Sequence, residues 1–182
     1  MRRLLIGLLG FTLLAHAYTY HTELLKIYSK IAPRIMLLVD DKERSAEEGY
    51  ALCILYEPGD EMHAMKLKRM MEEAYPNGLK GRKFNIKSAT FGNCCECGDA
   101  DLFMLFDTQP ERIRSIVEKA NRNGIATMAY SNRFLREGVM LSLELGTTVR
   151  PYLNLQTAKD AGIPVNEVLL RISKIYQKGA EE

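Results

Sequence analysis

The sequence contains no tryptophan, only three histidines and four cysteines, and no marked excess of charge of either sign. Because 25 Lys and Arg residues face 23 Asp and Glu residues, the net charge of +2 gives no electrostatic basis for nucleic-acid binding. No Walker A loop and no G-x-G-x-x-G string is present, so the common phosphate-binding signatures are missing. His21 and His63 lie outside any catalytic motif, no Ser-His-Asp set is indicated, and we expect no enzymatic activity.

The first residues have the order of a secretory signal peptide. Arg2 and Arg3 precede an uncharged, mostly apolar run over residues 4–14, and the small residues Ala15 and Ala17 follow. As a helix this run would be roughly 16 Å long, too short for a hydrocarbon core of ~30 Å. An N-terminal anchor or a buried helix is the alternative interpretation. We expect cleavage after Ala17, which leaves an exported domain over residues 18–182. We expect that the cleaved protein is not an integral membrane protein.

Apolar runs alternate with helical patterns along the exported part of the chain. Strands are predicted at residues 50–56, 84–87, 102–106, 125–130, 139–145 and 147–152, the last two as a hairpin. Four helices are predicted. The first begins at Thr22 and is ended or kinked by Pro33, and the second runs from Asp60 to Ala74. The third follows a capping box at Thr108–Glu111, and the fourth runs from Val165 to Tyr176. This order predicts an α/β fold, a single layered domain with a mixed β-sheet flanked by helices.

The ends of these strands are the expected place for a binding site. Ligands on α/β sheets usually bind beyond the carboxyl ends of the strands. That rule points to residues 57–60, 107–108 and 130–133. Within the last segment, the candidate ligand- or partner-binding residues are Tyr130, Ser131, Asn132 and Arg133.

The four cysteines of an exported protein suggest two disulfides. A bridge between the adjacent Cys94 and Cys95 would be strained, so Cys53 is expected to pair with Cys94, Cys95 or Cys97. One alternative is a four-thiolate metal site. Another is redox exchange at Cys94 and Cys97, although thioredoxin-type exchange requires that spacing at a helix N-terminus and here it precedes a strand.

Met62, His63 and Met65 lie on one predicted helix and form an alternative metal site. Thioether and imidazole groups are soft ligands that could bind copper in an exported protein. The competing interpretation is that methionines of this helix fill gaps in and beside the core. We expect no metal and no cofactor.

Several short strings resemble the YfiR-type family of periplasmic regulators over roughly residues 20–177. Gly81 and Arg82 match the family's entry to a strand, and Phe134 and Gly138 match its approach to the hairpin. Asn154 matches the end of the second hairpin strand. The likeness lies in the order and spacing of these strings and is strongest in the last third of the chain.

The cysteines match this family only in part. Cys53 corresponds to a cysteine on the family's first strand, whereas the usual cysteine beside the middle strand falls near Ala100, and this chain offers Cys97 instead. The usual Gly-Gly before the hairpin is Glu137-Gly138, and its flanking cysteines are absent. The family's disulfide pattern therefore does not carry over, and a Cys53–Cys97 link is a hypothesis.

The resemblance implies a non-enzymatic periplasmic protein that restrains a membrane-bound sensor, such as a diguanylate cyclase or a sensor kinase. The expected partner is the periplasmic domain of that sensor, with cyclic-di-GMP signalling downstream. Self-association into a homodimer is an open alternative. Two other functions are alternatives. One is a small periplasmic solute-binding protein, which a deep pocket near Ser131 and Asn132 would favour, and the other is a metal-handling protein using the cysteines and methionines.

Overall fold

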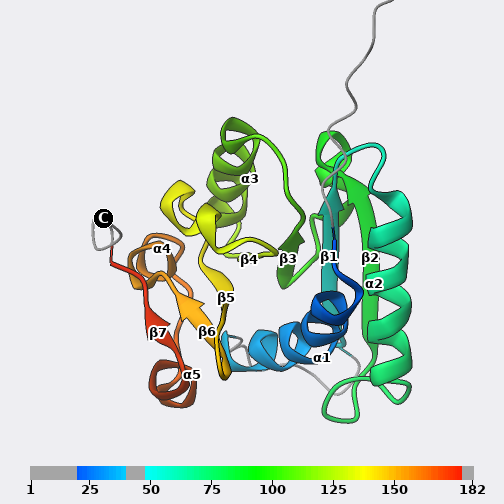
Figure 1. The fold of residues 1–182 in the computed structure, drawn as a ribbon, viewed down its shortest axis with the longest axis horizontal. Coiled ribbons are helices and arrows are strands. Elements are labelled where there is room, and N and C mark those ends of the chain that lie inside the picture. Colours follow the sequence, from blue (N-terminus) through cyan, green and yellow to red (C-terminus); the bar gives the residue numbers. More distant parts are fainter. Residues whose placement is uncertain (1–19, 40–47, 178–182) are drawn as a thin grey trace, which may run out of the picture.

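A mixed β-sheet of seven strands, in the order β2-β1-β3-β4-β5-β6-β7, runs through the molecule (Figure 1). The computed structural model describes residues 20–39 and 48–177, so the expected signal peptide lies outside the described residues. β1 to β5 are parallel, β6 returns antiparallel to β5, and β7 is parallel to β6. The strands are β1 (Tyr50–Tyr56), β2 (Phe84–Thr90), β3 (Leu102–Leu105), β4 (Ala126–Ala129), β5 (Leu141–Leu145), β6 (Val149–Leu153) and β7 (Lys174–Ile175).

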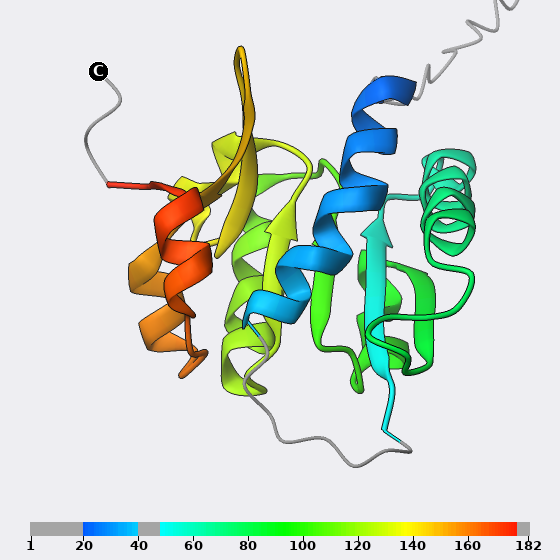
Figure 2. The ribbon, with the colours of Figure 1, turned by 90° about the horizontal axis from the view of Figure 1, so that it is seen from below.

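Helices cover both faces of this sheet, and Figure 2 shows α1 and α3 on opposite sides of it. Side chains of α1 and α2 belong to one buried cluster, and those of α3 and two 3-10 helices, η1 and η2, belong to the other. The predicted layered α/β fold is therefore confirmed. The helices are α1 (Thr22–Val39), α2 (Glu61–Ala74), η1 (Phe91–Cys97), α3 (Pro110–Arg122), η2 (Asn132–Glu137), α4 (Leu155–Asp160) and α5 (Glu167–Ile172).

The central strands are buried on both faces, which explains why they appear in the sequence as continuous apolar runs. Along β1, Leu52 and Ile54 enter the cluster under α1 and α2, whereas Cys53 and Leu55 enter the cluster under α3. The stripe predicted for the helix after Pro110 is buried as expected, and Gly124 ends its last turn at φ 61°.

The first helix does not end at Pro33, contrary to one sequence prediction, but continues to Val39. Proline in a helix interior removes one backbone hydrogen bond and costs about 3 kcal/mol. Beyond it, Ile35, Met36 and Val39 are all buried against the sheet. Burial of these side chains outweighs the local cost of the proline.

The predicted capping box at Thr108 is wrong. Gln109 is the N-cap of α3, and the Thr108 hydroxyl instead donates a hydrogen bond to the carboxylate of Glu57. Asp60 does occupy the N-cap position of α2, but its side chain makes no cap bond and accepts from Tyr20. Neither side chain caps a helix, because Thr108 bonds to Glu57 and Asp60 bonds to Tyr20 instead.

The predicted helix from Val165 to Tyr176 is also wrong, because only Glu167–Ile172 is helical. Asn166 caps that short helix by accepting from two backbone N–H groups, and Leu169 alone of its side chains is buried. The chain then pairs with the free edge of β6 as β7. The short helix α4, preceding this segment, was not predicted as a separate element.

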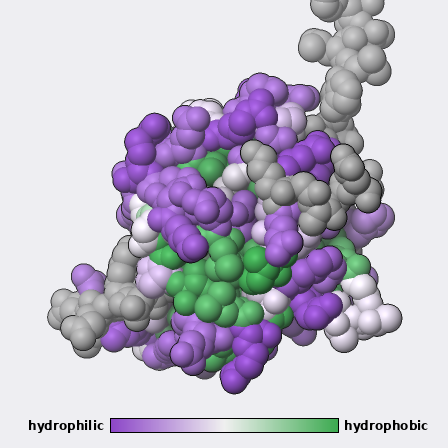
Figure 3. Space-filling model, turned by 90° about the vertical axis from the view of Figure 1, so that its left-hand side faces the viewer, coloured by the Kyte–Doolittle hydropathy of each residue, from purple (hydrophilic) through white to green (hydrophobic). Residues whose placement is uncertain are grey.

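The side of the molecule that carries α4, β7 and α5 presents a broad apolar area (Figure 3). Three side chains of α5 are unusually exposed for apolar residues: Val168 at 41%, Leu170 at 38% and Ile172 at 42%. Val168 and Ile172 are about one helical turn apart and share one side of α5, and we refer to these two residues as the α5 face.

Candidate functional site

The strand order places a crevice between β1 and β3. The chain leaves β1 for β2 on one side and returns to β3 on the other, so the connecting helices α2 and α3 lie on opposite faces. Ligands of such sheets bind beyond the carboxyl strand ends at this reversal. Glu57 follows β1 here, Asp107 follows β3, and Tyr130 follows β4. The structure brings together the three segments that the sequence singled out.

One side of the crevice is closed by contacts between β1 and the start of α3. Glu57 accepts from the Thr108 hydroxyl through Oε1, and its Oε2 lies 2.9 Å from Nη1 of Arg112. These bonds hold the loop after β3 against the end of β1. They also explain why Thr108 is unavailable to cap its own helix.

Tyr20, just before α1, fills the middle of the crevice. Its hydroxyl donates to Oδ2 of Asp60 at 3.1 Å and accepts from the backbone N–H of Asp107 at 3.0 Å. Its ring stacks on Phe106 with 4.5 Å between ring centroids. Burial raises the pKa of the Asp60 carboxyl above its ordinary value, and the hydrogen bond from Tyr20 opposes that rise. The segment just before α1 is therefore anchored at the strand ends.

Asp107 carries the least satisfied polar group of the crevice. Its Oδ2 lies 3.6 Å from Nη2 of Arg133, whereas Oδ1 is buried and accepts no hydrogen bond within the part of the chain that the structure describes. Burial raises the pKa of the Asp107 carboxyl, while the charge of Arg133 opposes the rise. Buried carboxylate oxygens nearly always have a partner, so this atom is a ready acceptor for a ligand donor.

A cavity of about 430 Å³ opens beside Asp107. Tyr130, Ser131 and Asn132 line it together with Asp107 and Glu144. The fourth candidate of that segment, Arg133, reaches the site through its ion pair with Asp107. Ligand pockets commonly have volumes of ≈ 300–1,000 Å³ with a few convergent polar groups, so this cavity has the size and lining of a small-molecule site.

Two family-motif residues support the wall of this cavity. Asn154 donates from its amide to the backbone oxygen of Leu135 at 3.1 Å and accepts from the Thr157 N–H at 3.2 Å. Phe134 is a buried residue of η2, which begins at Asn132. These two side chains help to fix the position of η2.

The glycines of the family motif occupy special backbone conformations. Gly138 ends η2 at φ 91°, with Val117 only 3.3 Å from where a Cβ would lie. Gly81 has φ 73° in the turn that leads through Arg82 toward β2, at the opposite end of the sheet from the crevice. Gly81 and Arg82 therefore belong to a turn that is separate from the cavity.

Met62, His63 and Met65 line a second cavity of about 640 Å³, to whose wall Tyr20 also contributes. Residues two apart on an α-helix leave it roughly 200° apart, so His63 and Met65 do not point the same way. Among the described residues, no group of three His, Cys, Asp or Glu side chains could hold a metal ion. The use of these methionines for copper stays a prediction.

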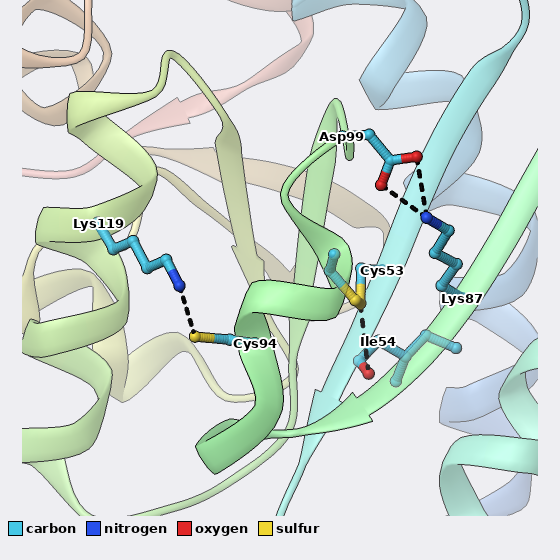
Figure 4. The surroundings of a disulfide bond; sticks show 7 residues. Cys53, Ile54, Lys87, Cys94, Asp99 and Lys119 are labelled. Atoms are coloured by element: carbon cyan, nitrogen blue, oxygen red, sulfur yellow. Dashed lines mark hydrogen bonds and ion pairs between the residues drawn. A yellow bond between two sulfur atoms is a disulfide. The ribbon is translucent and has the colours of Figure 1, made fainter.

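Cys53 on β1 and Cys97 on η1 form a disulfide with 5.9 Å between their Cα atoms (Figure 4). The expectation of two disulfides is wrong, because Cys94 and Cys95 are free. Cys95 is exposed and Cys94 faces Lys119, so the two adjacent sulfurs point to different surroundings. The disulfide ties η1 to the centre of the sheet on the α3 side.

Sequence reasoning missed Tyr20 as a site residue. It lies next to the expected signal peptide, and nothing in its neighbours marks a buried hydroxyl. α1 supplies a further long-range contact through Tyr28, whose hydroxyl donates toward the backbone oxygens of Ala129 and Tyr130 at 2.9 Å.

No helix in the described ranges is both long and apolar enough to cross a membrane.

Two solved structures are similar to this chain in fold. One is a conserved domain protein from Vibrio cholerae O1 biovar El Tor, with a TM-score of 0.59 and 11% identity, covering 82% of this chain and 60% of that one. The other is the ABC domain in complex with L-Trp from Streptococcus pneumoniae, with a TM-score of 0.55 and 11% identity, covering 79% and 61%. This chain thus spans about three fifths of each. No curated protein matches the sequence.

The family comparison covers the sheet, the crevice and the disulfide. The model of the YfiR/HmsC-like family (DUF4154) matches residues 40–174, which is most of the chain. This stretch includes β1 to β6, the cavity wall from Tyr130 to Asn132, and both cysteines of the disulfide. The protein therefore belongs to the YfiR/HmsC-like family.

Proposed function

We propose that this protein is a non-enzymatic periplasmic regulator that restrains a membrane-bound sensor, such as a diguanylate cyclase or a sensor kinase. Its membership of the YfiR/HmsC-like family carries the proposal. The folded domain binds the periplasmic part of the sensor better in one state than in another and thereby shifts the population of states.

Export supports this role. Residues 1–17 act as a signal peptide that is removed after Ala17, leaving a domain over residues 18–182. A disulfide between Cys53 and Cys97 fits an oxidising compartment. N-terminal sequencing of the exported protein is expected to begin at Tyr18, and an intact Met1 on the exported protein would contradict cleavage.

The α5 face is the surface proposed to contact the sensor. Monomeric proteins rarely expose large contiguous apolar patches, and such patches mark interaction sites. The α5 face is exposed, and the side of the molecule that carries α5 shows a broad apolar area (Figure 3). Self-association over the same face is the competing use.

Deleting the gene is expected to raise cellular cyclic-di-GMP about fivefold or more, because an allosteric restraint typically changes an equilibrium by that factor. The wild-type gene should restore the low level, and Ile172→Glu on the α5 face should not, because a buried carboxylate disrupts an apolar contact. Met65→Glu, on an exposed site of α2, is the matched control and should restore it. Unchanged cyclic-di-GMP after deletion would contradict regulation of a cyclase.

Small-solute binding is the second candidate function. The cavity beside Asp107, with its unpaired buried oxygen, favours it, and one similar fold is that of a domain in complex with L-Trp. A solute that fits the cavity should raise the melting temperature of the wild type and not that of Asn132→Leu. If no amino acid or other small polar solute shifts the wild type, this function is wrong.

A further inference from the structure

The exposed methionines of α2 line a cavity that the proposed function does not use. Met62 is 80% exposed and Met65 is 58% exposed. Both line the cavity of about 640 Å³ together with the half-buried Met70, and we call this space the α2 cavity. Clustered apolar side chains at a surface mark binding sites. Because the thioether side chain is flexible and polarizable, a wall of methionines adapts to an apolar ligand.

Two segments of the chain enclose the α2 cavity. Its second wall comes from Tyr20 and Thr22, at the start of α1, which packs beside α2 (Figure 1). Nζ of Lys66 donates to Oγ1 of Thr22 at 2.7 Å, and the rings of Tyr20 and His63 lie 5.1 Å apart. These contacts hold the two walls in place. The cavity volume is within the range of ≈ 300–1,000 Å³ that is usual for small-molecule pockets.

The charged residues of the α2 cavity favour an anion. Lys66 and Arg69 both line it, against one acidic residue, Glu73. Arg69 forms no ion pair with any residue that the structure describes, although Glu73 is only four positions further along α2. A guanidinium offers two parallel N–H donors to a carboxylate. Arg69 is therefore available to bind the charged head of a ligand.

Met62 and Arg69 lie on the same side of α2. They are seven residues apart, which is two helical turns and about 10 Å along the helix axis. Met65 lies on the turn between them, three residues after Met62 and four before Arg69, so the three side chains are neighbours on the helix surface. An alkyl chain that lies along the methionines therefore places an anionic head beside Arg69.

We propose that the α2 cavity binds a fatty-acid-like carboxylate. Its alkyl chain contacts Met62, Met65 and Met70, and its carboxylate pairs with Arg69. Removal of the chain from water supplies the affinity, in proportion to the apolar area that is buried. The ion pair supplies the selectivity for an anion over a cation of the same chain length. This binding needs no partner protein, so it stands independently of the proposed regulation of a sensor.

Isothermal titration of the full exported domain with decanoate, below its micelle concentration, tests the site. We expect a Kd of about 0.1 mM, which is reasonable for a ligand of this size. Octanoate should bind at least about fourfold more weakly, because it buries fewer methylene groups. Decyltrimethylammonium, which carries the opposite charge, should also bind more weakly than decanoate.

Charge reversal at Arg69 tests the position of the carboxylate. Arg69→Glu should weaken decanoate binding at least about tenfold and strengthen decyltrimethylammonium binding, because the charge beside the head group changes sign. Lys68→Glu is the matched control. It makes the same change in net charge on α2, but Lys68 lies 3.9 Å from Glu72 and does not line the cavity, so decanoate should bind as it does to the wild type.

Nuclear magnetic resonance of the wild type, with ¹³C-labelled methionine methyl groups, locates the ligand without any variant of the cavity. Decanoate should shift the signals of Met62 and Met65 and leave those of Met104 and Met128, which are fully buried in the sheet, in place. An absence of decanoate binding, shifts confined to other methionines, or equal weakening by Arg69→Glu and Lys68→Glu would overturn the proposal. Binding to phosphatidylglycerol vesicles without binding of decanoate would also overturn it and would identify a membrane surface as the ligand instead.

Discussion

Replacing both Cys53 and Cys97 with alanine is expected to lower the free energy of unfolding by about 4 kcal/mol. The two residues are 44 apart in the sequence, so their bond removes much conformational freedom from the unfolded chain. Both are fully buried, and the small alanine side chains also leave a void between β1 and η1. For a chain of this length, the melting temperature should fall by roughly 10 °C.

Urea unfolding of the double variant and the wild type, both without reductant, measures this effect. Cys95→Ala is the matched control, since its thiol is exposed and free, and it should change stability by no more than about 0.5 kcal/mol. The wild type in reductant should approach the double variant. If oxidised wild type and double variant unfold at the same urea concentration, the disulfide does not stabilise the fold as described.

Tyr20→Ala is expected to destabilise the protein by about 3–5 kcal/mol, the range for truncating a buried aromatic side chain. The ring stacks on Phe106 and meets Tyr130 edge-on at 4.9 Å, so its removal empties the centre of the crevice. The hydroxyl also bridges Asp60 to the backbone of Asp107. The cavity that Met62 and His63 line would also lose Tyr20 from its wall.

Chemical denaturation of two companion variants separates the ring from the hydroxyl. Tyr20→Phe keeps the stacking and should cost about 1–3 kcal/mol, because the buried carboxylate and N–H lose their partner. Met62→Ala lies on the neighbouring cavity wall, is 80% exposed in the wild type, and should have almost no effect. A Tyr20→Ala protein as stable as Met62→Ala would mean that the segment before α1 is not anchored at the strand ends.

The sheet could be predicted because its signals are local. The strand from Tyr50 to Tyr56 and the run from Leu102 are continuous apolar segments bounded by polar residues, and parallel strands buried on both faces require that composition. The hairpin was marked by Gly146 between two strand-like segments. The strand-end rule then located the crevice, because it depends on topology rather than on any single residue.

The features that escaped prediction depend on contacts between distant segments. Thr108 has the spacing of a capping box, but its hydroxyl bonds to Glu57, which is 51 residues away. Pro33 ends many helices, yet here buried side chains beyond it hold the helix together. At the C-terminus, the free edge of β6 recruits residues that would otherwise have extended α5.

The pairing of the cysteines also depends on contacts between distant segments of the chain. Composition allowed Cys53 to bond to any of three loop cysteines, and only the turn of η1 decides which sulfur faces β1. Neither the partner of Cys94 nor the exposure of Cys95 follows from their adjacency in the sequence. Local spacing alone could not reveal the contact with Lys119 on α3.

The central claim is that the exported, oxidised domain binds the periplasmic domain of a membrane sensor. Isothermal titration of the two purified domains tests it most directly, with the periplasmic domains of the membrane-bound diguanylate cyclases and sensor kinases of the same organism as the titrants. We expect a Kd of about 1 μM or tighter, weakened at least about tenfold by Ile172→Glu through loss of buried apolar contact and unchanged by Met65→Glu. Absence of heat at protein concentrations of about 100 μM, a hundred times the expected Kd, would contradict the claim.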